Sequence, residues 1–175
     1  MKTPEKYTSL RVGVHWSMVL LLVAVYAAME LRDFFPKGSS AKEGLETWHF
    51  MLGLSVLLLV VLRLLARWTQ PGPPEVQGAA WQMWLAKAIH LGLYVFMFGM
   101  PLAGWLILST AGKPVPFFGL ELPALMGPDK TLSGQIKDVH EVVATIGYFM
   151  IGLHALGALF HHYFLKDNTL RRMWL

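Results

Sequence analysis

Four long runs of apolar residues, separated by polar or helix-breaking stretches, dominate the chain. They extend roughly over residues 12–29, 47–65, 84–107 and 139–160. Each run approaches the ~20 residues that a helix needs to cross about 30 Å of hydrocarbon. The pattern therefore predicts an all-α fold, a four-helix transmembrane bundle in which residues 1–175 form one domain.

The stretches between these runs contain residues that end helices. RWTQPGPPEVQG follows the second run, and its prolines cannot continue a helix. The third connection, residues 109–137, is the longest and contains four prolines. We expect it to hold a short surface helix.

Composition agrees with a membrane protein. Of the 175 residues 55% are hydrophobic and only 15% are charged, whereas a soluble domain carries about 25% charged residues. The first run has no small-residue cleavage site after it, so we expect an uncleaved insertion signal. Cysteine is absent, which excludes disulfides, iron–sulfur ligation and covalent haem attachment. The expected partner is the lipid bilayer, and no nucleic-acid partner is expected.

The distribution of charge predicts an orientation. Nine basic residues lie on the side that holds both termini, against three acids, and six lie on the other side against eight acids. Lys and Arg are enriched on the cytoplasmic side of membrane proteins. Both termini are therefore expected in the cytoplasm. The outward-facing basic residues are Arg32, Lys37, Lys42, Lys113, Lys130 and Lys137.

Five histidines lie within the apolar runs, where an imidazole is costly and by default functional, and four of them group into two pairs by depth. His140 and His154 are fourteen residues apart, which is just under four helical turns and about 21 Å along nearly one face. The topology places His49 and His140 near the outer surface, and His15 and His154 in the inner half. Each pair could supply both axial ligands of a haem b, and an iron with both positions filled suits electron transfer. The predicted cofactors are thus two haems b.

The inner pair has a competitor. His90 lies in the third run, about 12 Å from its inner end, and could bind iron in place of His15 or His154. The pattern of the sequence alone leaves this alternative open.

Other polar residues near the inner surface have two interpretations each. Arg63, fourteen residues after His49, and Arg67 are candidates to pair with haem propionates, or they only anchor the helix as inward-facing cations. His161 and His162 either anchor the last helix at the interface or donate hydrogen bonds to a quinone.

The residues around these histidines resemble the bacterial diheme cytochrome b561 family over nearly the whole chain. The most specific segment is GYFMIGLHALGALFHHYFLKDNTLRRM, and VHW around His15, MELRDFFPK after the first run and HE at His140 agree with it. The resemblance implies haem ligation by the same four histidines, His15, His49, His140 and His154. No motif of the resemblance identifies the quinone contacts.

The resemblance also implies an activity, that of a superoxide:ubiquinone oxidoreductase of the bacterial inner membrane. Superoxide would be oxidised to dioxygen at the periplasmic face, and electrons would pass through the two haems b to ubiquinone. Lys113, Lys130 and Lys137 are candidates to steer this anion, with the other outer cations, because clustered like charge accelerates encounter. No obligatory protein partner is expected. Two alternatives remain: a cytochrome b subunit that docks to a hydrogenase- or dehydrogenase-type partner, and a small membrane transporter without haem.

Overall fold

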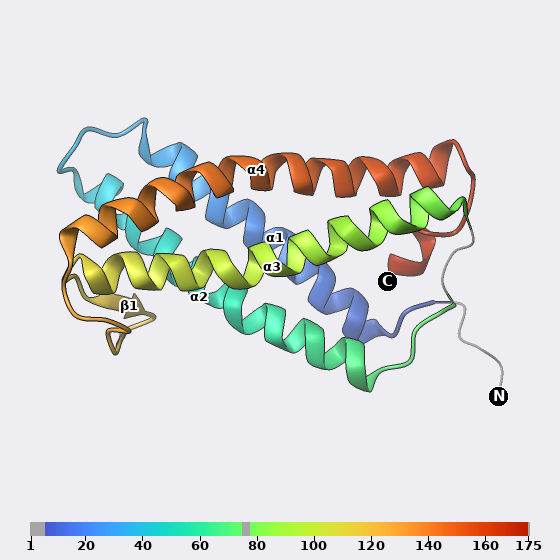
Figure 1. Ribbon diagram of the computed structural model, residues 1–175, viewed down its shortest axis with the longest axis horizontal. Coiled ribbons are helices and arrows are strands. Elements are labelled where there is room, and N and C mark those ends of the chain that lie inside the picture. Colours follow the sequence, from blue (N-terminus) through green and yellow to red (C-terminus); the bar gives the residue numbers. More distant parts are fainter. Residues whose placement is uncertain (1–5, 75–77, 175) are drawn as a thin grey trace.

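Each predicted apolar run lies within one long helix of the computed structural model, which describes residues 6–74 and 78–174 (Figure 1). All four helices are long and apolar enough to cross a membrane. Three of the charged residues counted above on the side of the termini lie outside the described residues: Lys2, Glu5 and Glu75. The helices are α1 (Ser9–Arg32), α2 (Ser40–Thr69), α3 (Ala80–Thr110) and α4 (Lys130–Tyr163), and a 3-10 turn, η1 (Arg171–Met173), follows α4.

Polar side chains cap the first turns of α1, α2 and α4, which begin ahead of their apolar runs. The hydroxyl of Ser39 accepts a hydrogen bond from the backbone N–H of Lys42 at 3.3 Å, and a carboxylate oxygen of Asp129 accepts one from Leu132 at 3.0 Å. Such side chains satisfy N–H groups that have no partner within the helix. Helices α2 and α4 therefore begin at polar residues ahead of their apolar runs.

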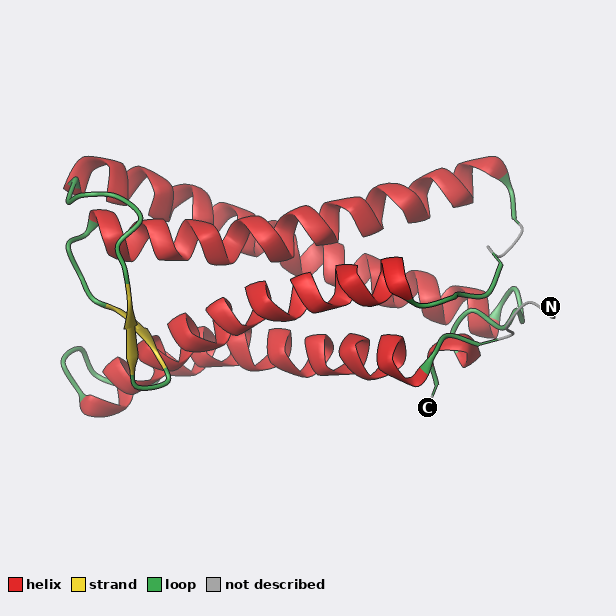
Figure 2. Ribbon diagram, turned by 90° about the horizontal axis from the view of Figure 1, so that it is seen from below, coloured by secondary structure: helices red, strands yellow, loops and turns green. Residues whose placement is uncertain are grey.

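Both termini of the described chain lie at one end of the bundle (Figures 1 and 2). We name this the terminal end, and the opposite end the hairpin end because a β-hairpin lies there. Helix α1 packs along α2, α2 along α3, and α3 along α4. The prediction that the terminal end faces the cytoplasm rests on charge alone.

The third connection contains a β-hairpin instead of the expected surface helix. Strand β1 (Val115–Phe117) pairs antiparallel with β2 (Leu120–Leu122). The two turn residues, Phe118 and Gly119, have φ of 46° and 84°, and two positive values are what a tight type I′ hairpin turn requires. Buried Val115 packs with Leu54 of α2 and Leu108 of α3, which fixes the hairpin against the bundle.

The core lies at mid-bundle, and the outward faces are apolar. Met18, Val56, Val60, Phe96 and Met97 form the buried cluster. In the most apolar stretch of each helix only 6% to 28% of residues are buried. Large apolar side chains such as Leu20, Leu58 and Phe149 are exposed, as lipid contact requires. On α4, buried Gly147 lies against Tyr26 and Phe96, and a Cβ atom there would overlap both side chains.

Candidate functional site

The structure brings the four predicted histidines together as two pairs, one towards each end of the bundle. His49 of α2 faces His140 of α4 towards the hairpin end, with ring centres 6.4 Å apart and ring planes at 77°. His15 of α1 faces His154 of α4 towards the terminal end, with ring centres 6.3 Å apart and planes at 78°. The pairing is the one predicted from depth.

The separation within each pair fits a shared metal ion. Two imidazoles on opposite sides of one metal, each with a nitrogen about 2.0 Å from it, have ring centres about 6 Å apart. Within residues 6–74 and 78–174, no group of three or more His, Asp or Glu side chains is placed to hold a metal ion. Two imidazoles alone do not complete a coordination shell, so the remaining ligands have to come from a bound group such as a porphyrin.

At the hairpin end, His49 has its second nitrogen arranged as metal-binding histidines require, whereas His140 does not. Nδ1 of His49 donates a hydrogen bond to the carbonyl of Val25 at 3.1 Å, which leaves Nε2 free to bind a metal. Nδ1 of His140 is buried and has no hydrogen-bond partner in the described part of the chain. A cavity of about 280 Å³ lies between the two histidines. Gly104 of α3 faces it, and a Cβ there would lie 3.8 Å from Cε1 of His140.

The terminal-end pair has an arginine in direct contact. Nη1 of Arg63 lies 2.7 Å from Nδ1 of His15. A guanidinium has only N–H donors, so Nδ1 accepts and the proton of this imidazole lies on Nε2. An imidazole that binds iron through Nε2 instead keeps its proton on Nδ1. Arg63 would therefore have to leave Nδ1 if this imidazole bound iron through Nε2. Arg67, in contrast, is exposed in the last turn of α2.

His90, the alternative ligand, lies beside the same pair. Its ring centre is 5.1 Å from that of His154, which is shorter than the ~6 Å expected for two imidazoles on opposite sides of one iron. Its Nδ1 donates to the carbonyl of Ala86 at 2.6 Å, one turn earlier in α3. The distances therefore favour His15 over His90 as the partner of His154.

His161 and His162 lie at the terminal end of α4, and only His161 has a carboxylate partner in the described chain. Nδ1 of His161 lies 2.5 Å from Oδ2 of Asp167, whose Oδ1 accepts from the N–H of Thr169 at 2.8 Å. Lys166, at φ 54°, turns the chain back so that Asp167 reaches the helix. Nδ1 of His162 is buried without a hydrogen-bond partner in the part that the structure describes.

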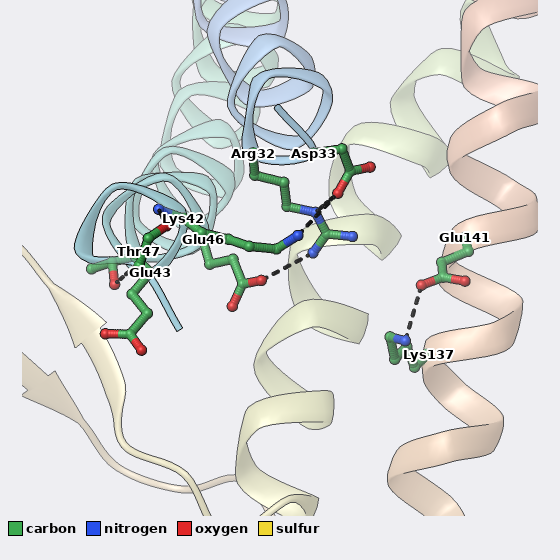
Figure 3. Close-up of polar contacts among 9 residues, drawn as sticks. Arg32, Asp33, Lys42, Glu43, Glu46, Thr47, Lys137 and Glu141 are labelled. Atoms are coloured by element: carbon green, nitrogen blue, oxygen red, sulfur yellow. Dashed lines mark hydrogen bonds and ion pairs between the residues drawn. The ribbon is translucent and has the colours of Figure 1, made fainter. Parts of the chain in front are cut away.

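Acids accompany several of the outer basic residues (Figure 3). Each such pair partly cancels the field that a steering surface needs. Lys113 and Lys130 are both exposed at the hairpin end, and they are the better candidates of the three predicted steering lysines. These ion pairs include Arg32–Asp33, Arg32–Glu46, Lys42–Asp33 and Lys137–Glu141, with N–O distances of 3.5, 3.3, 3.3 and 3.2 Å.

Sequence reasoning missed a polar group in the wall of the hairpin-end cavity. The hydroxyl of Tyr148 donates to Oε1 of Glu30 at 2.7 Å, and its ring lies 4.2 Å from that of Tyr26. The three residues connect α1 to α4 beside the cavity. Glu30, a carboxylate next to an apolar run, was the one feature of the sequence that could have indicated this polar contact.

Comparison of the sequence with known proteins identifies a family. Residues 6–175 match the family described as prokaryotic cytochrome b561. The chain is 38% identical to cytochrome b561 homolog 1 of Escherichia coli (strain K12) over 97% of both chains. It is 37% identical to a protein of Yersinia pestis named probable superoxide oxidase CybB, over 97% of this chain and 96% of that one. It is 27% identical to cytochrome b561 homolog 2 of Escherichia coli (strain K12), over 98% and 92% of the two chains.

Proposed function

The chain belongs to the prokaryotic cytochrome b561 family, and we propose that it oxidises superoxide at its hairpin end and reduces ubiquinone at its terminal end. Membership makes it a membrane cytochrome b, a multi-pass protein of the bacterial inner membrane with haem b as cofactor. The observation that carries the proposal is the presence of two histidine pairs with ring centres 6.4 and 6.3 Å apart, one towards each end of the bundle. The relative named as a probable superoxide oxidase supports the choice of donor.

We infer two haems b per chain, one held by His49 and His140 and the other by His15 and His154. When bound, such groups supply two one-electron centres at different depths in the bilayer. With two histidines to hold each group, the protein would favour electron transfer over ligand binding at iron. Arg63, which has to leave His15 on iron binding, has the charge and planar geometry to pair with a propionate.

The two half reactions need different things from the protein. Each superoxide loses one electron and becomes dioxygen, and no proton is involved. Reduction of ubiquinone to ubiquinol takes two electrons and two protons. The quinone site therefore needs access to protons, and the terminal end, predicted to face the cytoplasm, provides it.

His161 and Asp167 are suited to deliver those protons. Partial burial works against ionisation of Asp167, yet hydrogen bonds from Thr169 and His161 hold its pKa below the usual value. Asp167 thus stays ionised near neutral pH and keeps a proton on Nδ1 of His161. Nε2 of His161 remains free to exchange a proton with a bound quinone. We therefore place the quinone beside this end of α4.

We predict that His161→Leu slows quinone reduction by about a hundredfold, the typical contribution of a positioned acid or base. His162→Leu is expected to slow it less, because His162 has no carboxylate partner within the described residues. Haem content and haem reduction by superoxide should remain normal in both variants. Steady-state ubiquinol formation and reduced-minus-oxidised spectra measure these quantities.

Phe164→Leu is the matched control, because it changes a large exposed side chain of the same turn without removing a proton donor. It should reduce quinone at the normal rate. Normal quinone reduction by both histidine variants, or quinone found bound at the hairpin end, would contradict this placement.

We predict that exposed lysines at the hairpin end accelerate the reaction with superoxide. Reversing Lys113 and Lys130 to glutamate should lower the second-order rate by up to about tenfold at low ionic strength. Raising salt from 0.1 to 1 M shortens the Debye length from about 10 to about 3 Å and should lower the rate of the unmodified protein. Lys166→Glu, at the opposite end, is the control. If the second-order rate with superoxide changes neither with salt nor with charge reversal, electrostatic steering is ruled out.

The function itself is tested with the detergent-purified protein alone. A superoxide source and ubiquinone are supplied, and dioxygen release and ubiquinol formation are followed together. We expect two superoxide ions consumed for each ubiquinol formed. Absence of quinone reduction without a further protein would contradict the proposed function.

A second candidate function is that of a cytochrome b subunit with a protein electron donor. The observation that favours it is the outer hairpin, where Phe118 and Leu120 are 54% and 66% exposed. Large apolar groups on an outer loop are typical of contact surfaces. Restoration of haem reduction by a soluble protein, with no reaction towards superoxide, would support this alternative.

A further inference from the structure

Arg32 lies at the hairpin end of α1, in the wall of the cavity between His49 and His140. Its side chain is only 27% exposed. Its Nε is buried and makes no hydrogen bond within the described chain. A buried guanidinium nitrogen without an acceptor is costly, so its position beside a cavity indicates that a further acceptor binds there.

The acids near Arg32 do not satisfy it. Nη1 donates to Glu46 at 3.3 Å, whereas Oδ1 of Asp33 forms only an ion pair with Nε, at 3.5 Å and without a hydrogen bond. The same oxygen also contacts Nζ of Lys42 at 3.3 Å. Figure 3 shows Arg32 between these groups. A guanidinium has five N–H donors in a fixed fork, so Arg32 retains donors for another planar anion.

The terminal-end pair offers a parallel. There Arg63 contacts His15 directly, and it has to find a new partner when iron binds. Each histidine pair thus has one partly buried arginine beside it, and neither arginine lies on α4. Arg32 of α1 accompanies the hairpin-end pair, and Arg63 of α2 accompanies the terminal-end pair. The two arginines lie towards opposite ends of the bundle, Arg32 in the last turn of α1 and Arg63 at the depth of the terminal-end pair.

We propose that Arg32 binds a carboxylate of the group held by His49 and His140, which for haem b is a propionate. The inference rests on the proposed function, because it needs a haem at this pair. A carboxylate matches the guanidinium fork with two parallel hydrogen bonds. Bound in this way, Arg32 would orient the haem and place a positive charge near its iron.

The charge has a consequence that can be measured. A reduced iron centre carries one positive charge less than the oxidised centre. A nearby cation therefore stabilises the reduced form and raises the reduction potential. Removing the cation should make the potential of the hairpin-end haem more negative and leave that of the terminal-end haem nearly unchanged.

The test compares Arg32→Gln with Lys130→Gln in the purified full-length protein. Lys130 is an exposed cation of the same end, ten residues before His140. Arg32→Gln should weaken haem binding at the hairpin end about tenfold or more, as loss of a supporting contact typically does, and shift its potential to a more negative value. Lys130→Gln should change neither. Arg32→Lys should restore much of the potential, because it returns the charge, and less of the binding, because it lacks the fork.

The terminal-end haem reports on folding and should be retained in every variant. If Arg32→Gln keeps both haems at unchanged potentials, the inference is wrong. If it only slows the reaction with superoxide, Arg32 attracts the substrate instead and the inference is also wrong. An unmodified protein without a hairpin-end haem would overturn the proposed function itself, which separates the two failures.

Discussion

Replacing His140 by alanine is expected to remove one of two haems, and to remove the one at the hairpin end. The variant leaves His49 without its partner across 6.4 Å, and His49 alone would not hold the haem. His154→Ala should remove the terminal-end haem in the same way. Haem per polypeptide should fall from two to one in each variant, and the remaining potential should differ between them. Pyridine haemochrome assay and redox titration measure both quantities.

His90→Ala is the matched control, because His90 lies 5.1 Å from His154 in the same part of the bundle. It should retain both haems. If His90→Ala loses a haem while His15→Ala does not, the terminal-end pair consists of His90 and His154, and the pairing argued from ring distances is wrong.

Replacing His15 by alanine is expected to separate the two half reactions. The hairpin-end haem should still be reduced by superoxide, whereas ubiquinol formation should fall to the background rate without enzyme. The physical reason is distance: the two α4 histidines lie fourteen residues apart, about 21 Å along the helix, and the proposed quinone site lies beyond the inner of them. Stopped-flow absorption follows haem reduction, and quinone reduction is followed on the same sample.

His49→Ala provides the reverse comparison, since it should abolish entry of electrons from superoxide at the hairpin end. Ubiquinol formation at the normal rate by His15→Ala would contradict the direction of flow proposed here. It would place the quinone beside the hairpin-end pair.

The helices and histidine pairs were predictable because both follow from periodicity and length. Apolar runs of about 20 residues have few alternatives to a spanning helix. Once the helices are antiparallel, spacing along each one gives depth, and depth alone groups His49 with His140. The same arithmetic placed Arg63 at the depth of the inner pair, where it contacts His15.

The hairpin and the polar partners were not predictable for equally physical reasons. The hairpin has strands of three residues, one of them with Pro116, and its turn uses Phe118 instead of the Asn or Asp that favours such turns. The contact between His161 and Asp167 depends on the left-handed backbone of Lys166, which no local pattern indicates. Arg32 was grouped with the outer cations, because charge counts say nothing about which side chain faces a cavity.

The most direct measurement of the central claim is the haem-to-polypeptide ratio of the purified protein, taken with its reduced-minus-oxidised spectrum. The account predicts two haems b per chain and two b-type components with different potentials, both with the low-spin character of two axial imidazoles. A chain that binds no haem, or one haem with an open axial position, would contradict it.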